Sequence, residues 1–326
     1  MIHADPLGIL TLITVGMCWS FSVVLFRAGT LGSVARRLAV LLIVDGVALA
    51  TSGSIESLFG SLDGLYRRAP WFVSAETMLH ALGDCGMLVL YPPFLAAALR
   101  TRLTRPFADK RVRTGIAAGA LLLYASLFWP LAVSLLTSEP VDFQALALPT
   151  GILYVALVVL FVFAFIAAMR VWHASTGAAR KRARIFAVAF GIRDLCWGFI
   201  YATQVWALWK GNFLAVFLEN PSWFIVYTLG TFIAVPLIAY GILRTQLFDI
   251  NLRIRWTIKQ STLAAAVIAI VYVLSEGASR LLSNELGNIA GLLAAADVNR
   301  RTISAAGMGR CQPAVVLQWA EQRIVE

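Results

Sequence analysis

The feature that most constrains this chain is a series of apolar runs, each about as long as a lipid bilayer is thick. A helix needs roughly 20 residues to cross the hydrocarbon core. Eight runs approach or exceed that length, at residues 7–26, 38–59, 75–99, 115–136, 150–171, 185–209, 223–243 and 261–282. Hydrophobic residues make up 60% of the chain and charged residues 13%, which is unlike a soluble domain. The sequence therefore predicts an all-α polytopic membrane protein.

Basic residues between the runs predict the orientation of the chain. Eighteen Lys and Arg residues lie at the ends of, or after, the first, third, fifth and seventh runs, whereas three follow the second, fourth and sixth runs. Because short cytoplasmic loops are enriched in Lys and Arg, this bias places the N-terminus outside the cytoplasmic membrane. We expect a seven-helix transmembrane bundle over residues 1–243. The basic residues face lipid headgroups in this arrangement, so the net charge of +10 does not indicate nucleic acid.

Three further segments are predicted after the bundle. Residues 244–260 form a cytoplasmic interfacial connector, and residues 261–296 supply an eighth helix and a partial ninth that stops after about a dozen residues. Residues 297–326 lose the apolar periodicity, and we interpret them as a poorly structured tail that is truncated or out of frame. The first apolar run has no basic residues before it, so we interpret it as a span and not as a cleaved signal.

Ionisable residues inside the apolar runs are candidates for a functional site, because burying them in a membrane is costly. They are Asp45, His80, Asp84, Arg193 and Asp194. His80 and Asp84 are four residues apart and share one helical face. This pair indicates a polar contact to a ligand, a pair that responds to protons, or simply an interhelical hydrogen bond.

The neighbours Arg193 and Asp194 point about 100° apart on a helix, so we expect them not to pair with each other. Each then needs a partner on another helix, and Asp45 or Asp84 can neutralise Arg193. Such an ion pair can equally be architectural. Trp197, Tyr201 and Gln204 follow on one face, which predicts either the wall of a small-molecule cavity or ordinary packing.

The sequence lacks the motifs of several known activities and cofactors. The seventh run has no lysine for a retinal Schiff base, and a single histidine lies inside a run, so two axial haem ligands are not available. The chain also has no phosphate-binding loop, no H-E-x-x-H and no G-x-S-x-G. We predict a protein that is not an enzyme and has no cofactor or metal.

Two other functions stay open: a small-solute transporter and a structural membrane subunit of a larger complex. Prolines 92, 93, 130 and 236 can break or kink three of the runs, as in transporters. No run recurs as a second copy, however, which disfavours an inverted repeat.

The stretch YGILRTQLFDI, from Tyr240 to Ile250, is similar to the segment that leaves the last core helix in the membrane sensor region of prokaryotic seven-transmembrane-type sensor histidine kinases. The matching residues are Tyr240, Gly241, Ile242, Leu243, Arg244, Leu247, Phe248, Asp249 and Ile250. The resemblance in topology covers about residues 7–296. No phosphoacceptor histidine box, ATP-binding domain or PAS-like module follows, so the resemblance implies a receptor-like signal-input module without its output domain.

The connector alternates apolar and polar residues, a period that predicts an extended segment. It serves either as a transmitter of the signal or as a basic anchor on anionic lipid. Its candidate residues are Arg244, Leu247, Phe248, Asp249, Arg253, Arg255 and Trp256. The expected partners are the lipid bilayer, a second copy in a homodimer, and a separate cytoplasmic signalling protein.

Overall fold

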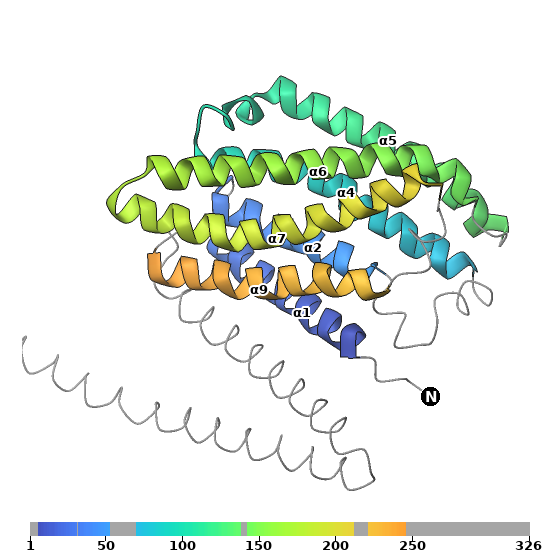
Figure 1. Ribbon diagram of the computed structural model, residues 1–326, viewed down its shortest axis with the longest axis horizontal. Coiled ribbons are helices and arrows are strands. Elements are labelled where there is room, and N and C mark those ends of the chain that lie inside the picture. Colours follow the sequence, from blue (N-terminus) through green and yellow to red (C-terminus); the bar gives the residue numbers. More distant parts are fainter. Residues whose placement is uncertain (1–5, 31, 53–69, 138–141, 212–220, 246–326) are drawn as a thin grey trace, which may run out of the picture. The chain divides into compact units, whose positions relative to one another are not determined.

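The computed structural model describes residues 6–30, 32–52, 70–137, 142–211 and 221–245 (Figure 1). These residues form seven α-helices and a short 3₁₀ helix, with no strand among them. The elements are α1 (Pro6–Ala28), α2 (Val34–Ala50), α4 (Pro70–Leu99), η2 (Arg105–Ala108), α5 (Lys110–Thr137), α6 (Phe143–Ala174), α7 (Gly177–Trp209) and α9 (Pro221–Thr245). The predicted all-α fold is confirmed. The eighth helix, the partial ninth, the tail and the connector from Gln246 onward lie outside the described residues.

Five helices in the described part of the chain are long and apolar enough to cross a membrane, so the prediction of a multi-pass membrane protein is supported. They correspond to the first, third, fourth, fifth and sixth predicted runs, within α1, α4, α5, α6 and α7. Helix α2 has 17 residues and rises about 26 Å, slightly less than the hydrocarbon core. The apolar part of α9, Ile225–Gly241, is similarly short. That α2 and α9 also cross the membrane, which would make seven spans, stays a prediction.

The second predicted run differs from the structure, because α2 begins at Val34 and ends at Ala50 where we expected helix over residues 38–59. Thr51 and Ser52 stop the helix. Their hydroxyl groups donate to backbone carbonyls of the last turn, Oγ1 of Thr51 to Val47 and Oγ of Ser52 to Leu49, each at 2.7 Å. Hydroxyl side chains near a helix end compete with its backbone bonds in this way.

Other helices extend past the apolar runs that predicted them. Helix α6 begins at Phe143, seven residues before its run, because the carboxylate of Asp142 accepts hydrogen bonds from the amides of Gln144 and Ala145 at 3.0 and 3.3 Å. An aspartate at this position satisfies amides that have no partner inside the helix. The prolines do not break the helices: α4 continues through Pro92 and Pro93.

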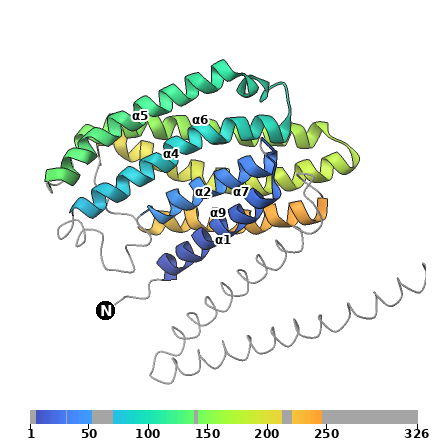
Figure 2. The same cartoon turned by 180° about the vertical axis from the view of Figure 1, so that it is seen from behind.

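Six helices form a closed ring and the seventh packs on its outside. In the ring α1 packs on α2, α2 on α4, α4 on α6, α6 on α7, α7 on α9, and α9 on α1. Among the described elements, helix α5 packs mainly on α4, with smaller contacts to α6 and η2, and it lies at the edge of the helices in both views (Figures 1 and 2). Its buried residues are Ala120, Leu127, Leu131 and Ser134, which form one stripe. The other residues of α5 are exposed or half-buried.

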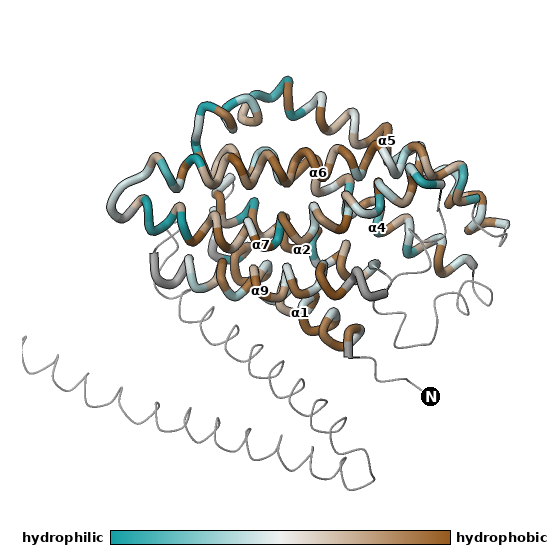
Figure 3. Tube along the Cα trace, viewed as in Figure 1, coloured by the Kyte–Doolittle hydropathy of each residue, from teal (hydrophilic) through white to brown (hydrophobic). Residues whose placement is uncertain are grey.

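Basic side chains gather at one end of the ring. Arginine or lysine lies at the start of α2, directly after α4, at the start of α5, near the end of α6 and at the start of α7. Figure 3 shows this as hydrophilic ends where α6 turns into α7 and where α4 leads into α5. We call it the basic end. At the opposite end the described residues include a single basic residue, Lys210.

Candidate functional site

Two helical faces bring most of the predicted site residues together inside the ring, along with two side chains that were not predicted. On α4 they are His80, Asp84, Met87 and Tyr91, at helical spacings of four, three and four residues. On α7 they are Arg193, Trp197 and Tyr201, each four residues apart. Except for His80, all of these side chains are almost fully buried. Side chains from α2 and α9 complete two adjacent clusters.

The first is the arginine cluster, formed by Arg193, Asp45, Asp194, Tyr91 and Met87. Nε and Nη2 of Arg193 donate to the two carboxylate oxygens of Asp45 at 2.9 and 2.6 Å, so the pair is bidentate. Nη1 donates to Oδ1 of Asp194 at 2.6 Å, and Nη2 lies 3.2 Å from the Met87 sulfur. The Tyr91 hydroxyl donates to the other oxygen of Asp194. The structure therefore selects Asp45 as the interhelical partner of Arg193.

The prediction that Arg193 and Asp194 cannot pair is wrong. Their Cα–Cβ bonds point in different directions, but the arginine side chain is long enough for its guanidinium to turn back toward the next residue. Its planar fork then offers separate N–H groups to two carboxylates at once. The pairing joins α2 to α7, and Asp194 carries it on to Tyr91 of α4.

Aromatic rings surround the guanidinium of Arg193. Its central carbon lies 5.1 Å from the ring centre of Tyr91, 4.9 Å from that of Trp197 and 5.7 Å from that of Phe161. Rings at such distances attract a cation. Removing one partner of a buried ion pair costs about 3–5 kcal/mol. The arginine cluster is therefore suited to fixing the arrangement of three helices.

The second is the tyrosine cluster, formed by His80, Asp84, Tyr201 and Tyr227. The Tyr201 hydroxyl lies 2.5 Å from Oδ1 of Asp84, to which it donates, and 3.2 Å from the Tyr227 hydroxyl. Nε2 of His80 lies 3.5 Å from Oδ2 of Asp84. The cluster thus runs without interruption from α4 through α7 to α9.

The hydrogen bonds of the tyrosine cluster are incomplete. Oδ2 of Asp84 is buried and has no hydrogen-bond partner among the described residues. Nδ1 of His80 lies 3.1 Å from the Ala48 carbonyl oxygen and 3.4 Å from the Thr51 hydroxyl. The carbonyl oxygen can only accept, so a hydrogen bond to it requires the tautomer with the proton on Nδ1. In the neutral imidazole Nε2 then has no proton to offer Asp84. An imidazolium has one, and can complete both contacts.

His80 is the part of the tyrosine cluster that the surroundings can reach. Its side chain is 18% exposed, against 1% for Asp84. Gln204, the last predicted member of the stripe on α7, joins neither cluster. It is half-buried, and its side-chain oxygen has no hydrogen-bond partner in the described part of the chain.

Sequence reasoning missed Met87, Tyr91, Tyr227 and Thr231. Met87 and Tyr91 continue the helical stripe of His80 and Asp84, a signal that could have found them. Tyr227 and Thr231 are four residues apart on α9. Trp197 stacks on Tyr227 with ring centres 4.1 Å apart, and its indole N–H donates to Thr231 at 2.9 Å.

A small residue lets α7 and α9 approach each other closely beside these contacts. An added Cβ at Gly230 would lie 2.5 Å from the Cys196 Cβ, well inside contact distance. A glycine is therefore required at this crossing for α9 to sit against Trp197 and Tyr201.

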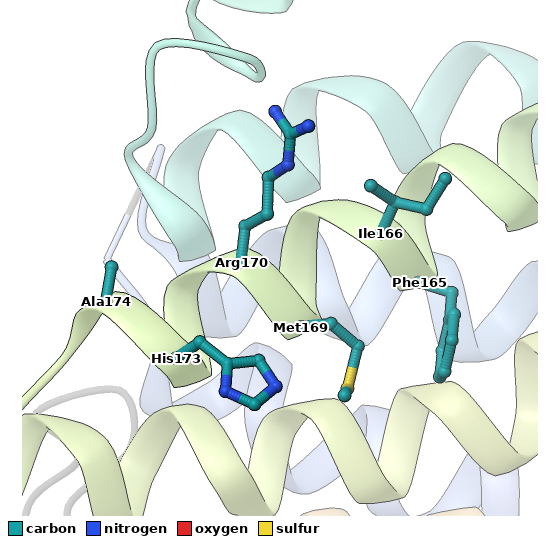
Figure 4. A pocket seen from close by; sticks show the side chains of 6 residues that line it. All are labelled: Phe165, Ile166, Met169, Arg170, His173 and Ala174. Atoms are coloured by element: carbon teal, nitrogen blue, oxygen red, sulfur yellow. The ribbon is translucent and has the colours of Figure 1, made fainter.

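One surface hollow is too simple to be a binding site. Its lining residues all belong to α6, and Figure 4 shows Arg170 pointing to one side of that helix while Met169 and His173 point to the other. Polar groups do not converge there. Among the described residues, no three His, Cys, Asp or Glu side chains lie together as a metal site requires.

Comparisons with protein-family models, with curated proteins and with solved structures found no match for this chain. The arguments that follow rest on its own geometry.

Proposed function

We propose that this chain is the receptor-like input module of a prokaryotic membrane signalling protein, and that the tyrosine cluster is the place where its stimulus acts. The observation that carries the proposal is the incomplete pair of His80 and Asp84, linked through Tyr201 to Tyr227 on α9. A proton on His80, or a small ligand that offers a hydrogen-bond donor to Asp84, completes the pair. Helix α9 includes the first two residues of the predicted connector, Arg244 and Thr245, where an extended segment was expected. The rest of the connector, up to residue 260, would pass the change on.

The magnitudes favour the tyrosine cluster over the arginine cluster as the element that switches. A hydrogen bond to a charged group contributes about 1.5–3 kcal/mol. That amount shifts a two-state equilibrium by roughly ten- to a hundredfold. Breaking the arginine cluster costs about 3–5 kcal/mol, which is harder for a weak stimulus to supply. The arginine cluster would hold α2, α4 and α7 in place while α9 shifts.

The proposed topology is a bundle of seven spans in the cytoplasmic membrane with the N-terminus outside. The gathering of basic residues at one end of the ring supports it, because such residues are enriched on the cytoplasmic side. The connector then leaves on the cytoplasmic face, where a second copy or a separate signalling protein can receive the signal.

Distance measurements between spin labels on α5 and α9 test this proposal. In the full chain, with its four native cysteines replaced, labels attached at Leu122→Cys and Leu229→Cys report how α9 sits relative to the outer helix; both positions are exposed. Histidine changes charge between about pH 5 and 8. We expect two distance populations in nanodiscs whose ratio changes at least fivefold across that range.

Two substitutions test whether the response depends on the tyrosine cluster itself or on the residues packed around it. Asp84→Asn removes the charge that attracts the imidazolium, and we expect it to abolish the response. Tyr154→Phe is the matched control, because Tyr154 packs its ring 4.9 Å from that of Tyr201 without being part of the cluster. If the distance distribution of the folded wild-type protein is the same at both ends of that pH range, the proposal is contradicted. Solute flux in reconstituted vesicles that Asp84→Asn abolishes would identify a transporter instead.

A further inference from the structure

A second candidate site lies at the basic end of the ring, where four segments enclose a cavity of about 760 Å³. Its lining comes from the turn between α1 and α2, the end of α4, the end of α6 and the start of α7. No member of the arginine or tyrosine cluster is among the described residues that line it. We call it the basic-end cavity, and its function is independent of the function proposed above.

The polar lining of the basic-end cavity suits a phosphate group. Arg100, which directly follows α4, and Arg182 of α7 both line the cavity and are both exposed. Thr30, Ser33 and Ser175 add hydroxyl groups that can donate hydrogen bonds. No acidic residue is among the described lining residues. Paired arginines without a nearby carboxylate are a common arrangement for binding phosphate.

The backbone around the cavity adds to the positive field. Helix α7 begins there, and the hydroxyl of its N-cap residue Thr176 accepts no hydrogen bond from the first turn. Uncapped amides at a helix start carry partial positive charge and favour anions. Arg100 follows the last residue of α4 with a φ of 51°, where glycine is the usual residue. The chain thus keeps a cation at a position where its backbone conformation is unfavourable.

The rest of the lining is apolar, and this decides what kind of phosphate compound fits. Ala98 and Leu99 of α4 and Val171 of α6 face the cavity, together with Phe186 of α7, which is 3% exposed. A free phosphate ion gains nothing from such a wall, whereas the glycerol and upper acyl carbons of a lipid do. We propose that the basic-end cavity binds the phosphate-bearing headgroup of an anionic phospholipid, with Arg100 and Arg182 as its counter-ions.

Lipid titration of the full chain, followed by native mass spectrometry, tests the proposal. Phosphatidylglycerol and phosphatidylcholine with the same acyl chains are compared at increasing concentrations. Basic residues near an anionic lipid surface each strengthen binding, and the loss of two predicts a Kd about thirtyfold weaker. We expect that weakening for phosphatidylglycerol in the double variant Arg100→Gln, Arg182→Gln.

The matched control is the double variant Arg180→Gln, Lys181→Gln. It removes the same charge from the first turns of α7, at two exposed residues that are not among those lining the cavity. We expect its Kd to change less than threefold. Equal weakening in both double variants would mean diffuse attraction to the basic end and would overturn the proposal.

Two further measurements distinguish the ligand sources. Ala98→Phe fills the apolar wall without changing any charge, and we expect it to weaken phosphatidylglycerol binding by more than tenfold. Inorganic phosphate at millimolar concentration is expected not to compete. Competition by phosphate at that concentration, full binding in Ala98→Phe, or equal affinity for phosphatidylcholine would each overturn the assignment to an anionic phospholipid.

Discussion

Replacing Asp45 by asparagine tests whether the buried ion pair with Arg193 holds α2 against α7. The substitution keeps the size of the side chain and one of its oxygens. It puts an NH₂ group where a carboxylate oxygen accepted a bond at 2.6 or 2.9 Å, so two donors then face each other. Asp194 still accepts a hydrogen bond from Arg193 at 2.6 Å, which reduces the loss of stability.

The expected loss of stability is near the lower end of the range for a broken buried pair. Removing one partner costs about 3–5 kcal/mol. Because Asp194 and the one oxygen of the introduced asparagine remain as acceptors, we expect about 3 kcal/mol. A protein with a stability of about 5–15 kcal/mol loses a substantial fraction in this way.

Reversible unfolding of the full chain in mixed detergent micelles measures the loss. Asp142→Asn is the control, because it makes the same chemical change at an exposed N-cap where asparagine serves as well as aspartate. We expect that control to stay within about 0.5 kcal/mol of the parent. Equal stability of the Asp45→Asn and Asp142→Asn proteins would refute the assignment of Asp45.

A double-mutant cycle sharpens the test, since the sequence left Asp84 as an alternative partner of Arg193. Combining Asp45→Asn with Arg193→Gln should reveal a coupling above about 1 kcal/mol, because the two side chains share bonds. The cycle of Asp84→Asn with Arg193→Gln should be additive within about 0.5 kcal/mol. The reverse pattern would mean that Arg193 pairs with Asp84 in the membrane.

Two further predictions concern the contacts between α7 and its neighbours. Tyr201→Phe removes a bond to Asp84 and should lower the free energy of unfolding by about 1–3 kcal/mol, whereas Tyr154→Phe should change it by less. Gly230→Ala places a Cβ 2.5 Å from that of Cys196 and should cost about 1–3 kcal/mol, measured in the same unfolding assay. Adding Cys196→Gly should restore most of the loss, and Gly119→Ala, with no atom within 4 Å of the new Cβ, should be neutral or stabilising. A Gly230→Ala protein as stable as the parent would show that α9 is not held this close to α7.

The sequence predicts the helical class and the approximate place of the described helices, because apolar runs of membrane length allow few other structures. It predicts helix ends less well. The end of α2 depends on hydroxyl groups of Thr51 and Ser52 that bond to the preceding turn, and the start of α6 depends on Asp142. These are local hydrogen bonds of single side chains, which hydrophobicity does not register.

The sequence predicted which residues form the candidate site better than it predicted which of them contact each other. Every ionisable residue singled out in the described runs does lie in one of the two clusters, because a membrane interior leaves such groups few alternatives to pairing with each other. Which carboxylate meets Arg193 depends on how α2 and α4 are rotated around their axes. Helical spacing within one run carries no information on that rotation.

The spacing along α7 explains how two clusters of different strength can serve one protein. Arg193, Trp197 and Tyr201 stand on one face, so α7 meets the arginine cluster at one turn and the tyrosine cluster two turns later. Trp197 lies between them, 4.9 Å from the Arg193 guanidinium and stacked on Tyr227 of α9. Asp84 is linked to α9 through the Tyr201 hydroxyl, and Tyr227 of α9 is held separately by its stacking on Trp197. Because the arginine cluster ties α7 to α2 and α4 two turns away, we expect a change at Asp84 to move α9 and not α7.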